Sequence, residues 1–461
     1  MILPFLQFLA AVALMLAIPL GGCTPWLGPQ AAAAPAAGNP SVRHIQRTMR
    51  SLAGERNPGE PVRILFYGQS ITAQPWWRAV VDDLRRRYPE AKIEAVNRAI
   101  GGFISPALRR TAAHDLSPFY PDLLVFHVYG DLENYEAIIR EAREATTAEI
   151  LLHTDHVAKD ENRLVSDDIH SEGVRAIAER HGCMLIDART QWKRHLAEAG
   201  LAPGDLLSDS IHLNDAGNAL LAGIVKREIE RTSAFGENDP AERQITDIPI
   251  DSPRIRTLAD GSLSLEFTGN RVVAVADGRN PEGRLAVRLD GKEPGAFLGT
   301  WAVTRPSAGI NWMPCIRRVE AGALPVAERW TLTCLDDSAA DGSRIHFTLT
   351  GSVTGADGEG WSDQDFTSTS GRIRIAKQDW AVGPILAIAK KTLPPEFTIT
   401  WSTVPMFASS FAPGAEGTET VLFQSVENGP HTLTIGPEPG ATVSGLAKLR
   451  VYDPAAMGGR P

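Results

Sequence analysis

The sequence is poor in cysteine and has no surplus of basic residues. Its 461 residues include four cysteines, and none of them has the Cys-x-x-Cys or Cys/His spacing of a zinc site. Acidic residues outnumber basic ones by 55 to 46, so the basic stripe of a nucleic-acid-binding domain is missing. We therefore expect no metal, no other cofactor and no nucleic-acid partner. Hydrophobic residues make up 43% of the chain, which is ordinary for a globular protein, and the length predicts two or three domains.

Positive charge is also missing from the N-terminus, because no Lys or Arg precedes Arg43. The apolar run from Leu9 to Leu20 is short for a membrane-spanning helix but suits the core of a signal peptide. It ends in Gly21-Gly22-Cys23, and small residues before a cysteine resemble a bacterial lipoprotein cleavage site. We predict that residues 1–23 are a signal peptide or lipoprotein leader. The protein would then be exported, as a periplasmic, secreted or membrane-anchored lipoprotein tethered through lipidated Cys23. An uncleaved N-terminal anchor is the alternative for this segment. Residues 24–59 are predicted to be a linker.

Residues 60–235 alternate short apolar runs with longer helical patterns. The predicted strands are Val62–Tyr67, Ile93–Asn97, Asp122–Tyr129, Glu149–His153 and Cys183–Ile186. The predicted helices are Trp76–Tyr88, Tyr135–Thr146, Ser171–His181 and Asn214–Arg231. Apolar strands that do not alternate with polar residues indicate a mostly parallel sheet covered on both faces. The pattern predicts a three-layer α/β domain.

Residues 254–461 have a different pattern, in which short runs of alternating apolar and polar residues are separated by turn residues. Examples are Ser262–Phe267, Arg271–Ala276, Trp330–Cys334 and Leu446–Val451. This pattern predicts an all-β sandwich or jelly roll of one or two modules. Cys315 and Cys334 lie in this region and could form a disulfide in an exported protein, or remain two buried thiols. Cys183, inside an apolar strand of the first domain, is predicted to be a buried free thiol.

A serine follows the first predicted strand. The segment Tyr67-Gly68-Gln69-Ser70 takes a buried strand into a tight turn, with a helix next along the chain. In a parallel sheet, ligands bind beyond the carboxyl ends of the strands, so Ser70 should lie at the ligand-binding edge. The N-H groups of a helix N-terminus would suit a developing oxyanion there. A serine that only caps the helix is the alternative interpretation.

An aspartate and a histidine stand three residues apart just before the last helix of this domain. In Asp209-Ser210-Ile211-His212 the carboxylate can reach the imidazole and orient it. The other ring nitrogen is then free to act as a general base. A helix-capping loop with a surface histidine would explain His212 alone, but it explains the pair less well.

Together these segments resemble the SGNH (GDSL-type) hydrolase superfamily. Gly68-Gln69-Ser70-Ile71-Thr72 is similar to the first block, G-D-S-x-T, with Gln69 in place of aspartate, and Asp209-x-x-His212 is similar to the last block. The second block resembles Asn97-Arg98-Ala99-Ile100-Gly101-Gly102. The resemblance covers residues 60 to 230, about two fifths of the chain. It implies a flavodoxin-like fold and a serine esterase with the triad Ser70, Asp209 and His212. It also implies an oxyanion hole that includes the backbone N-H groups of Ser70 and Gly102.

The third block departs from the family pattern. The family has G-x-N-D after a strand that begins Pro-Asp, and counting from Pro121 places Asp131 where the asparagine should be. An ionised Asp131 would repel an oxyanion, so as an oxyanion-hole residue it would have to be protonated. Asn134, three residues further on, could supply an amide if the loop bends. His127 is expected to be a core histidine, and His153-Thr154-Asp155-His156 to contact substrate or complete a loop network at the edge that carries Ser70.

The catalytic blocks do not identify the ester. Export and the long β-rich region favour an acylated carbohydrate, and removal of acetyl groups is the leading interpretation. An O-acyltransferase and a lipid esterase on the same scaffold are alternatives. A catalytically inactive carbohydrate-binding protein is the alternative from a different class, and the oligomeric state is open.

Overall fold

The computed structural model describes residues 39–160, 162–232, 240–437 and 442–454. The predicted leader, with Cys23, lies outside these ranges, as do residues 24–38 of the predicted linker. Residues 40–52, which the sequence assigned to the linker, instead form η1 (Pro40–Ile45) and α1 (Gln46–Leu52), because their apolar side chains, Val42, Ile45, Met49 and Leu52, are buried in the α/β core. Within the described ranges, no helix combines the length and the apolar character needed to span a bilayer.

The N-terminal part contains a five-stranded parallel sheet in the order β2-β1-β3-β4-β5. Its strands are β1 (Pro61–Gly68), β2 (Lys92–Asn97), β3 (Leu123–His127), β4 (Glu149–His153) and β5 (Met184–Ile186). This is the flavodoxin-like order, and in such sheets ligands bind where the strand order reverses, here at the carboxyl ends of β1 and β3. All five predicted strands are present.

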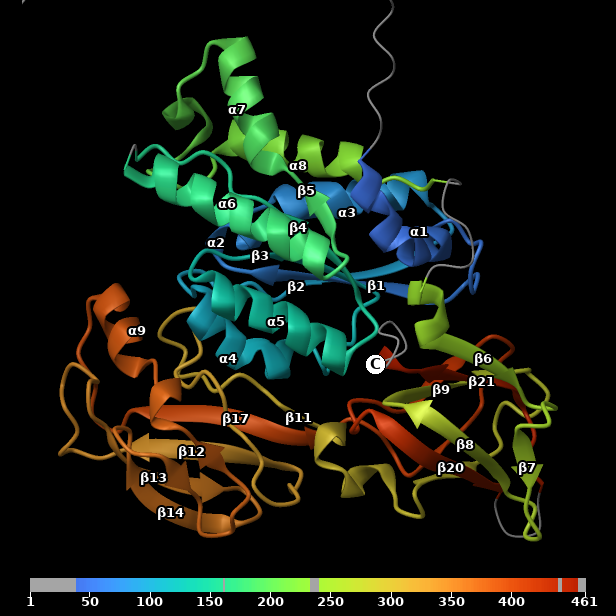
Figure 1. Ribbon diagram of the computed structural model, residues 1–461. Coiled ribbons are helices and arrows are strands. Elements are labelled where there is room, and N and C mark those ends of the chain that lie inside the picture. The colour runs from blue at the N-terminus through green and yellow to red at the C-terminus, as the bar shows by residue number, and fades with distance from the viewer. Residues whose placement is uncertain (1–38, 161, 233–239, 438–441, 455–461) are drawn as a thin grey trace, which may run out of the picture. The chain divides into compact units, whose positions relative to one another are not determined.

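Helices cover both faces of this sheet (Figure 1). One face packs against α1 (Gln46–Leu52), α3 (Trp76–Arg87), α7 (Ala188–Ala199) and α8 (Asp215–Glu228). The other packs against α4 (Ser105–Asp115), α5 (Leu132–Ala145) and α6 (Asn162–Arg180). Successive β1 residues serve both cores, since Ile64 and Phe66 point to the first and Leu65 and Tyr67 to the second. The predicted three-layer α/β fold is therefore confirmed.

The β-rich part begins with an antiparallel sandwich. One sheet has the order β18-β10-β20-β8-β7 and the other β19-β9-β21-β6. The strands are β6 (Ile245–Pro249), β7 (Ile255–Thr257), β8 (Leu263–Gly269), β9 (Arg271–Ala276), β10 (Leu285–Leu289), β18 (Ser410–Phe411), β19 (Glu419–Phe423), β20 (Gly429–Pro437) and β21 (Leu446–Tyr452). Side chains from both sheets, such as Leu265 and Val272, form one buried cluster, as in a β-sandwich.

A third sheet is inserted between β10 and β18, in the order β11-β17-β12-β13-β14. Its strands are β11 (Trp301–Val303), β12 (Glu328–Cys334), β13 (His346–Gly351), β14 (Gly355–Trp361) and β17 (Thr398–Pro405). A small hairpin of β15 (Phe366–Thr367) and β16 (Arg374–Ile375) and the helix α9 (Val382–Ala389) lie between β14 and β17. The β-rich part therefore consists of a sandwich and an inserted sheet.

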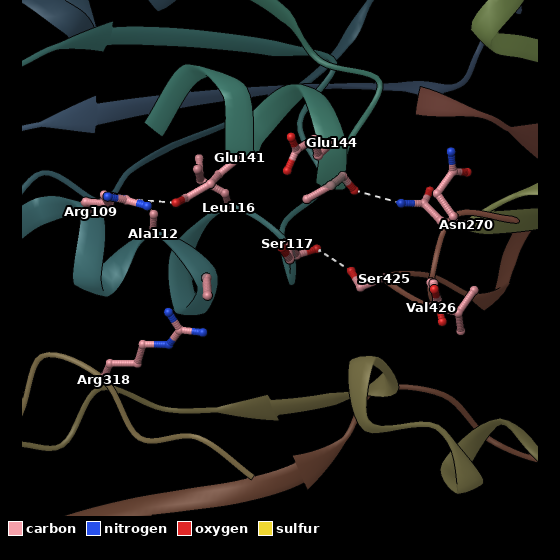
Figure 2. A pocket seen from close by; sticks show the side chains of 14 residues that line it. Arg109, Ala112, Leu116, Ser117, Glu141, Glu144, Asn270, Arg318, Ser425 and Val426 are labelled. Carbon is pink, nitrogen blue, oxygen red and sulfur yellow. Dashed lines mark hydrogen bonds and ion pairs between the residues drawn. The ribbon is translucent and has the colours of Figure 1, made fainter. Parts of the chain in front are cut away.

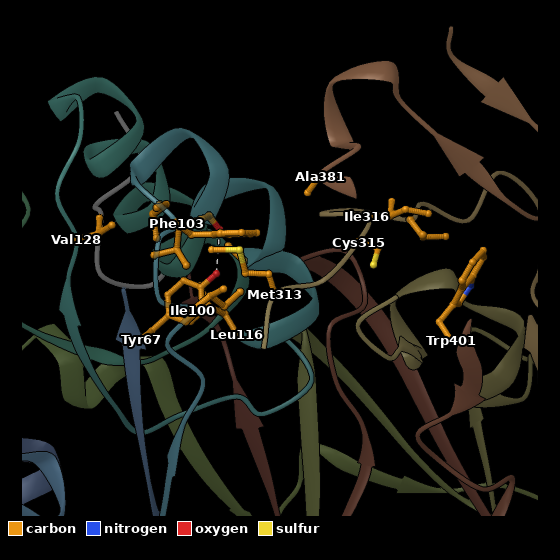
Figure 3. Packing of buried hydrophobic residues seen from close by; sticks show 14 of the residues in the cluster. Tyr67, Ile100, Phe103, Leu116, Val128, Met313, Cys315, Ile316, Ala381 and Trp401 are labelled. Carbon is orange, nitrogen blue, oxygen red and sulfur yellow. Dashed lines mark hydrogen bonds between the residues drawn. The ribbon is translucent and has the colours of Figure 1, made fainter. Parts of the chain in front are cut away.

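The inserted sheet shares its hydrophobic core with the α/β part. A single buried cluster contains Tyr67 and Ile100 from the α/β part, Trp401 from β17, and Met313 from the connection between β11 and β12. Figure 3 shows Met313 next to Ile100 and Leu116, with Trp401 further along the same cluster. Burial of one continuous apolar cluster couples the stability of the two parts.

The three cysteines in the described part of the chain are free and buried. Burial raises the pKa of Cys315 to about 11 and that of Cys334 to about 12. Of the two alternatives for this pair, the structure has two buried thiols, and Cys183 is also a buried free thiol as predicted.

Candidate active site

Ser70 stands at the point where β1 ends and the short helix α2 (Ser70–Ala73) begins. The turn requires glycine at position 68, because a Cβ there would overlap the carbonyl oxygen of His127 on β3 and the side chain of Thr72. Gly68 lets the two central strands and α2 approach each other closely. The half-buried Ser70 is thereby placed at the carboxyl end of β1, where the strand order reverses.

The turn after β2 lies beside Ser70. The N-H of Ile100 donates to the carbonyl of Gly68 at 2.9 Å, and the side chain of Asn97 donates to the carbonyl of Thr72 at 2.7 Å. A Cβ built on Gly101 would be 3.6 Å from the Cβ of Ser70. Gly102 has a φ of +86°, a conformation that favours glycine. The structure therefore brings the first and second sequence blocks together.

Asp209 and His212 form a hydrogen-bonded pair in the loop before α8. Oδ2 of Asp209 lies 2.7 Å from Nδ1 of His212, and Oδ1 accepts the backbone N-H groups of Ile211 and His212 at 2.8 and 2.7 Å. These hydrogen bonds, the backbone ones first, lower the pKa of Asp209 to about 2. The carboxylate is therefore ionised at neutral pH, and it holds Nδ1 as a donor. Nε2 is then the ring nitrogen that can accept a proton.

Two side chains hold this loop in place. Gln74, directly after α2, pairs with the backbone of Leu213: its amide donates to the Leu213 carbonyl at 2.8 Å and its oxygen accepts the Leu213 N-H at 3.0 Å. The buried His156 places Nε2 2.7 Å from the carbonyl oxygen of Ile211. The His212 loop is thus fastened to the segment that begins with Ser70. The first, second and last sequence blocks therefore lie together at the carboxyl edge of the sheet.

Asp131 has a different contact from the one expected of an oxyanion-hole residue. It is the N-cap of α5, and its carboxylate accepts the backbone N-H of Asn134 at 2.8 Å and the Asn134 side-chain amide at 3.0 Å. Burial raises the pKa of Asp131, but hydrogen bonds from Asn134 and Ser105 outweigh it and leave the pKa below its ordinary value. An ionised carboxylate repels an oxyanion, so this geometry favours a capping role for Asp131. The Asn134 side-chain amide is already hydrogen-bonded to the same carboxylate.

A buried polar network lies behind the site, and only part of it was visible in the sequence. Asp155 accepts from His127 and from His170, each at 2.8 Å, and these hydrogen bonds lower its pKa although burial opposes them. His127 stacks on His153, with ring centres 4.3 Å apart. All four residues from His153 to His156 are at most 2% exposed, so they complete a loop network rather than line an open surface. His170, in the middle of α6, was not singled out by the sequence.

The inserted sheet contributes to the same edge of the molecule. The indole N-H of Trp312, in the connection between β11 and β12, donates to the carbonyl of Gly101 at 2.9 Å. Met313 packs over Gly102, where an added Cβ would collide with its terminal methyl group. Neither residue could be singled out from the sequence, because both are more than 200 positions away from the turn that they contact.

A separate cleft of about 430 Å³ lies at the C-terminal ends of α4 and α5 (Figure 2). Both arginines of its lining are paired, since Arg109 bonds to Glu141 at 2.8 Å and Arg318 to Glu320 at 2.8 Å. Its lining contains neither Ser70 nor His212. The described ranges also hold no group of three or more His, Cys, Asp or Glu side chains arranged to bind a metal ion.

Comparisons with known proteins give structural matches only. No family model and no curated protein matches the sequence. Among solved structures the chain is similar to an acetylxylan esterase from Geobacillus stearothermophilus, with 25% identity over 38% of this chain and 98% of the other, at a TM-score of 0.33. It is similar to an alpha/beta hydrolase enzyme from the metagenome of Lake Arreo, Spain (23% identity, 38% and 97% covered, TM-score 0.33). A third match is a protein described as a GDSL-like lipase from Parabacteroides merdae (18%, 37% and 96%, TM-score 0.33).

Proposed function

We propose that this protein is a serine ester hydrolase of the SGNH type that uses Ser70, His212 and Asp209. The observation that carries the proposal is the Asp209–His212 pair, at 2.7 Å, fastened through Gln74 to the segment that begins with Ser70. A carboxylate with a pKa of about 2, an imidazole oriented by it, and a serine at the carboxyl edge of a parallel sheet are the parts that nucleophilic acyl transfer requires.

The reaction follows from these parts. Nε2 of His212 accepts the Ser70 proton as the Ser70 oxygen bonds to the ester carbonyl carbon. The negative charge that develops on the carbonyl oxygen is met by the backbone N-H groups of Ser70 and Gly102. The imidazolium, stabilised by Asp209, returns its proton to the departing alcohol, and an acyl-serine remains. Water then adds to the acyl group with His212 as base, which releases the acid and restores the Ser70 hydroxyl.

For the substrate, we propose a small acyl ester, an acetyl group, on a carbohydrate. We also propose export through residues 1–23 with lipidation at Cys23, which labelling of the full chain and of Cys23→Ala with radioactive palmitate tests. Incorporation into the full chain alone supports the tether, and equal incorporation into both chains contradicts it.

The test of the activity is hydrolysis of p-nitrophenyl acetate, butyrate and octanoate by the leaderless protein and by its Ser70→Ala variant. We expect acetate hydrolysis that falls by at least about a thousandfold in the variant and that decreases with chain length. A preference for octanoate would favour a lipid esterase. No hydrolysis by a folded protein would count against the proposal and favour an acyltransferase or a catalytically inactive carbohydrate-binding protein.

A further inference from the structure

The connection between β11 and β12, residues 304–327, is fixed against the α/β part at several points. Arg305 bonds to both carboxylate oxygens of the buried Asp115 at 3.1 and 2.7 Å, and to the carbonyl of Arg98 at 2.6 Å. The backbone N-H of Val319 donates to Nε2 of His114 at 3.2 Å. With the burial of Met313 between these anchors, the connection has a defined path along the turn next to Ser70.

Trp312 is exposed at the point where this path passes Ser70. Its side chain is 64% exposed, whereas Met313, the next residue, is buried. Nε1 of Trp312 and Cβ of Ser70 lie 3.2 and 3.6 Å from the point that a Gly101 Cβ would occupy, so they are at most about 7 Å apart. The edge of the indole ring is therefore close to Ser70, so a group bound at Ser70 can lie against the ring.

The hydrogen bond to Gly101 determines which part of the indole a ligand can meet. The N-H at the ring edge is already used, so the ring offers its face and its remaining edge. An exposed aromatic face held in place in this way presents apolar surface at a low entropic cost of binding. The flat C-H face of a sugar ring matches such a surface. A long acyl chain would instead require enclosure on several sides.

We propose that Trp312, contributed by the inserted β-sheet, is a substrate-contacting residue that stacks on the sugar ring bearing the scissile ester. The inference rests on the proposed function of Ser70. It assigns the inserted sheet a direct part in the choice of substrate: the α/β part would supply the acyl-transfer chemistry and the β-rich part the recognition of the sugar.

The test compares an ester that has a sugar ring with one that has none. Hydrolysis of peracetylated methyl β-xyloside and of ethyl acetate is followed by acid release in the wild type, Trp312→Ala and Trp312→Phe. We expect Trp312→Ala to lower kcat/KM for the xyloside about tenfold, mainly through KM, and to change ethyl acetate less than about twofold. Trp312→Phe keeps a ring without the N-H bond to Gly101 and should recover most of the loss. Trp361→Ala, at the end of β14, is the matched control and should change neither ester.

Three outcomes would overturn the inference. An equal loss on both esters in Trp312→Ala would mean that Trp312 only positions the Gly101 turn. Unchanged kinetics on both would mean that it does not touch the substrate. A larger loss on ethyl hexanoate than on the xyloside would assign the ring to the acyl chain.

A binding measurement tests the sugar contact of Trp312 independently of the proposed role of Ser70. Calorimetric titration of the xyloside into Ser70→Ala and into Ser70→Ala/Trp312→Ala needs no turnover. Binding that weakens about tenfold in the double variant supports the sugar contact even if Ser70 proves not to be the nucleophile. Equal binding by the two variants, or none by either, contradicts it.

Discussion

At the residue scale, Asp209 uses both carboxylate oxygens to hold one imidazole. One oxygen fixes the ring and the other fixes the backbone of the same residue, His212. Replacing Asp209 by Asn removes the charge that stabilises the imidazolium and permits the wrong ring tautomer. We expect kcat to fall by about 10² to 10⁴ with the fold intact, as measured on p-nitrophenyl acetate beside a circular dichroism spectrum. Asp215→Asn, an exposed aspartate in the first turn of α8, is the control and should keep full activity.

Asp131 allows the capping role to be tested against the oxyanion role. Asn caps helices as well as Asp does, so Asp131→Asn should change the free energy of unfolding by less than about 0.5 kcal/mol, while Asp131→Ala should cost about 1 kcal/mol. Urea unfolding measures both. Because the carboxylate is committed to Asn134, we expect kcat of Asp131→Asn to stay within about twofold of the wild type. A kcat more than tenfold lower, with stability unchanged, would place the Asp131 side chain in the reaction after all.

At the scale of elements, Gln74 joins two segments that each carry a catalytic group. Its amide makes two hydrogen bonds to Leu213, next to His212 in the chain. Gln74→Ala should cost about 1 to 2 kcal/mol of stability and, by loosening the His212 loop, lower kcat about 10- to 100-fold with a smaller change in KM. Urea unfolding and steady-state kinetics measure the two effects.

Gln191→Ala is the matched control for Gln74→Ala. Its amide also makes two side-chain hydrogen bonds, but to Glu228 and Arg227 on α8, away from the His212 loop. It should leave kcat unchanged. A kcat for Gln74→Ala equal to the wild-type value would mean that this pairing does not position His212.

The elements that were predicted differ in a physical way from those that were missed. β1, β3 and β4 are buried on both faces, so their apolar runs were visible in the sequence. α4 was missed because its buried face includes Ser105, Thr111 and Asp115 as well as Leu108, which leaves little apolar contrast. α7 was also missed, although its sequence contains helix signals. These are an N-cap at Asp187, Trp192 and Leu196 one turn apart, and a left-handed glycine at its end.

At the scale of the whole molecule, the arrangement of the β-rich part could not be predicted from local pattern. β10 pairs with β20, more than 140 residues later, and a complete sheet is inserted between them. Strand alternation reports which side chains face a core but not which strand is the partner. For the same reason local pattern singled out Ser70, Gly102, Asp209 and His212 as site candidates but held no sign that Trp312 contacts Gly101, next to Ser70.

The contact between α4 and the connection that carries Trp312 depends on a neutral histidine. Burial, followed by the charges of Arg318 and Arg305, lowers the pKa of His114 to about 4. Nε2 of His114 accepts the N-H of Val319, and a proton on that nitrogen would remove this hydrogen bond. Between pH 6.5 and 4 the unfolded chain therefore binds a proton that the folded protein does not. Stability is then lost as the pH falls through this window, by up to about 1.4 kcal/mol per pH unit from this histidine.

His114→Gln tests this linkage, because the Gln side chain is neutral at every pH in the window and its oxygen can still accept the Val319 N-H. We expect the free energy of unfolding in urea, measured at pH 7.5, 6.0 and 5.0, to fall less steeply in His114→Gln than in the wild type. His195→Gln, a half-exposed histidine on α7, is the control and should keep the wild-type slope. Identical slopes in His114→Gln and the wild type would mean that His114 takes up its proton in the folded protein without cost. The acid sensitivity would then have to come from other groups, such as the buried His153 and His156, whose pKa values burial also lowers.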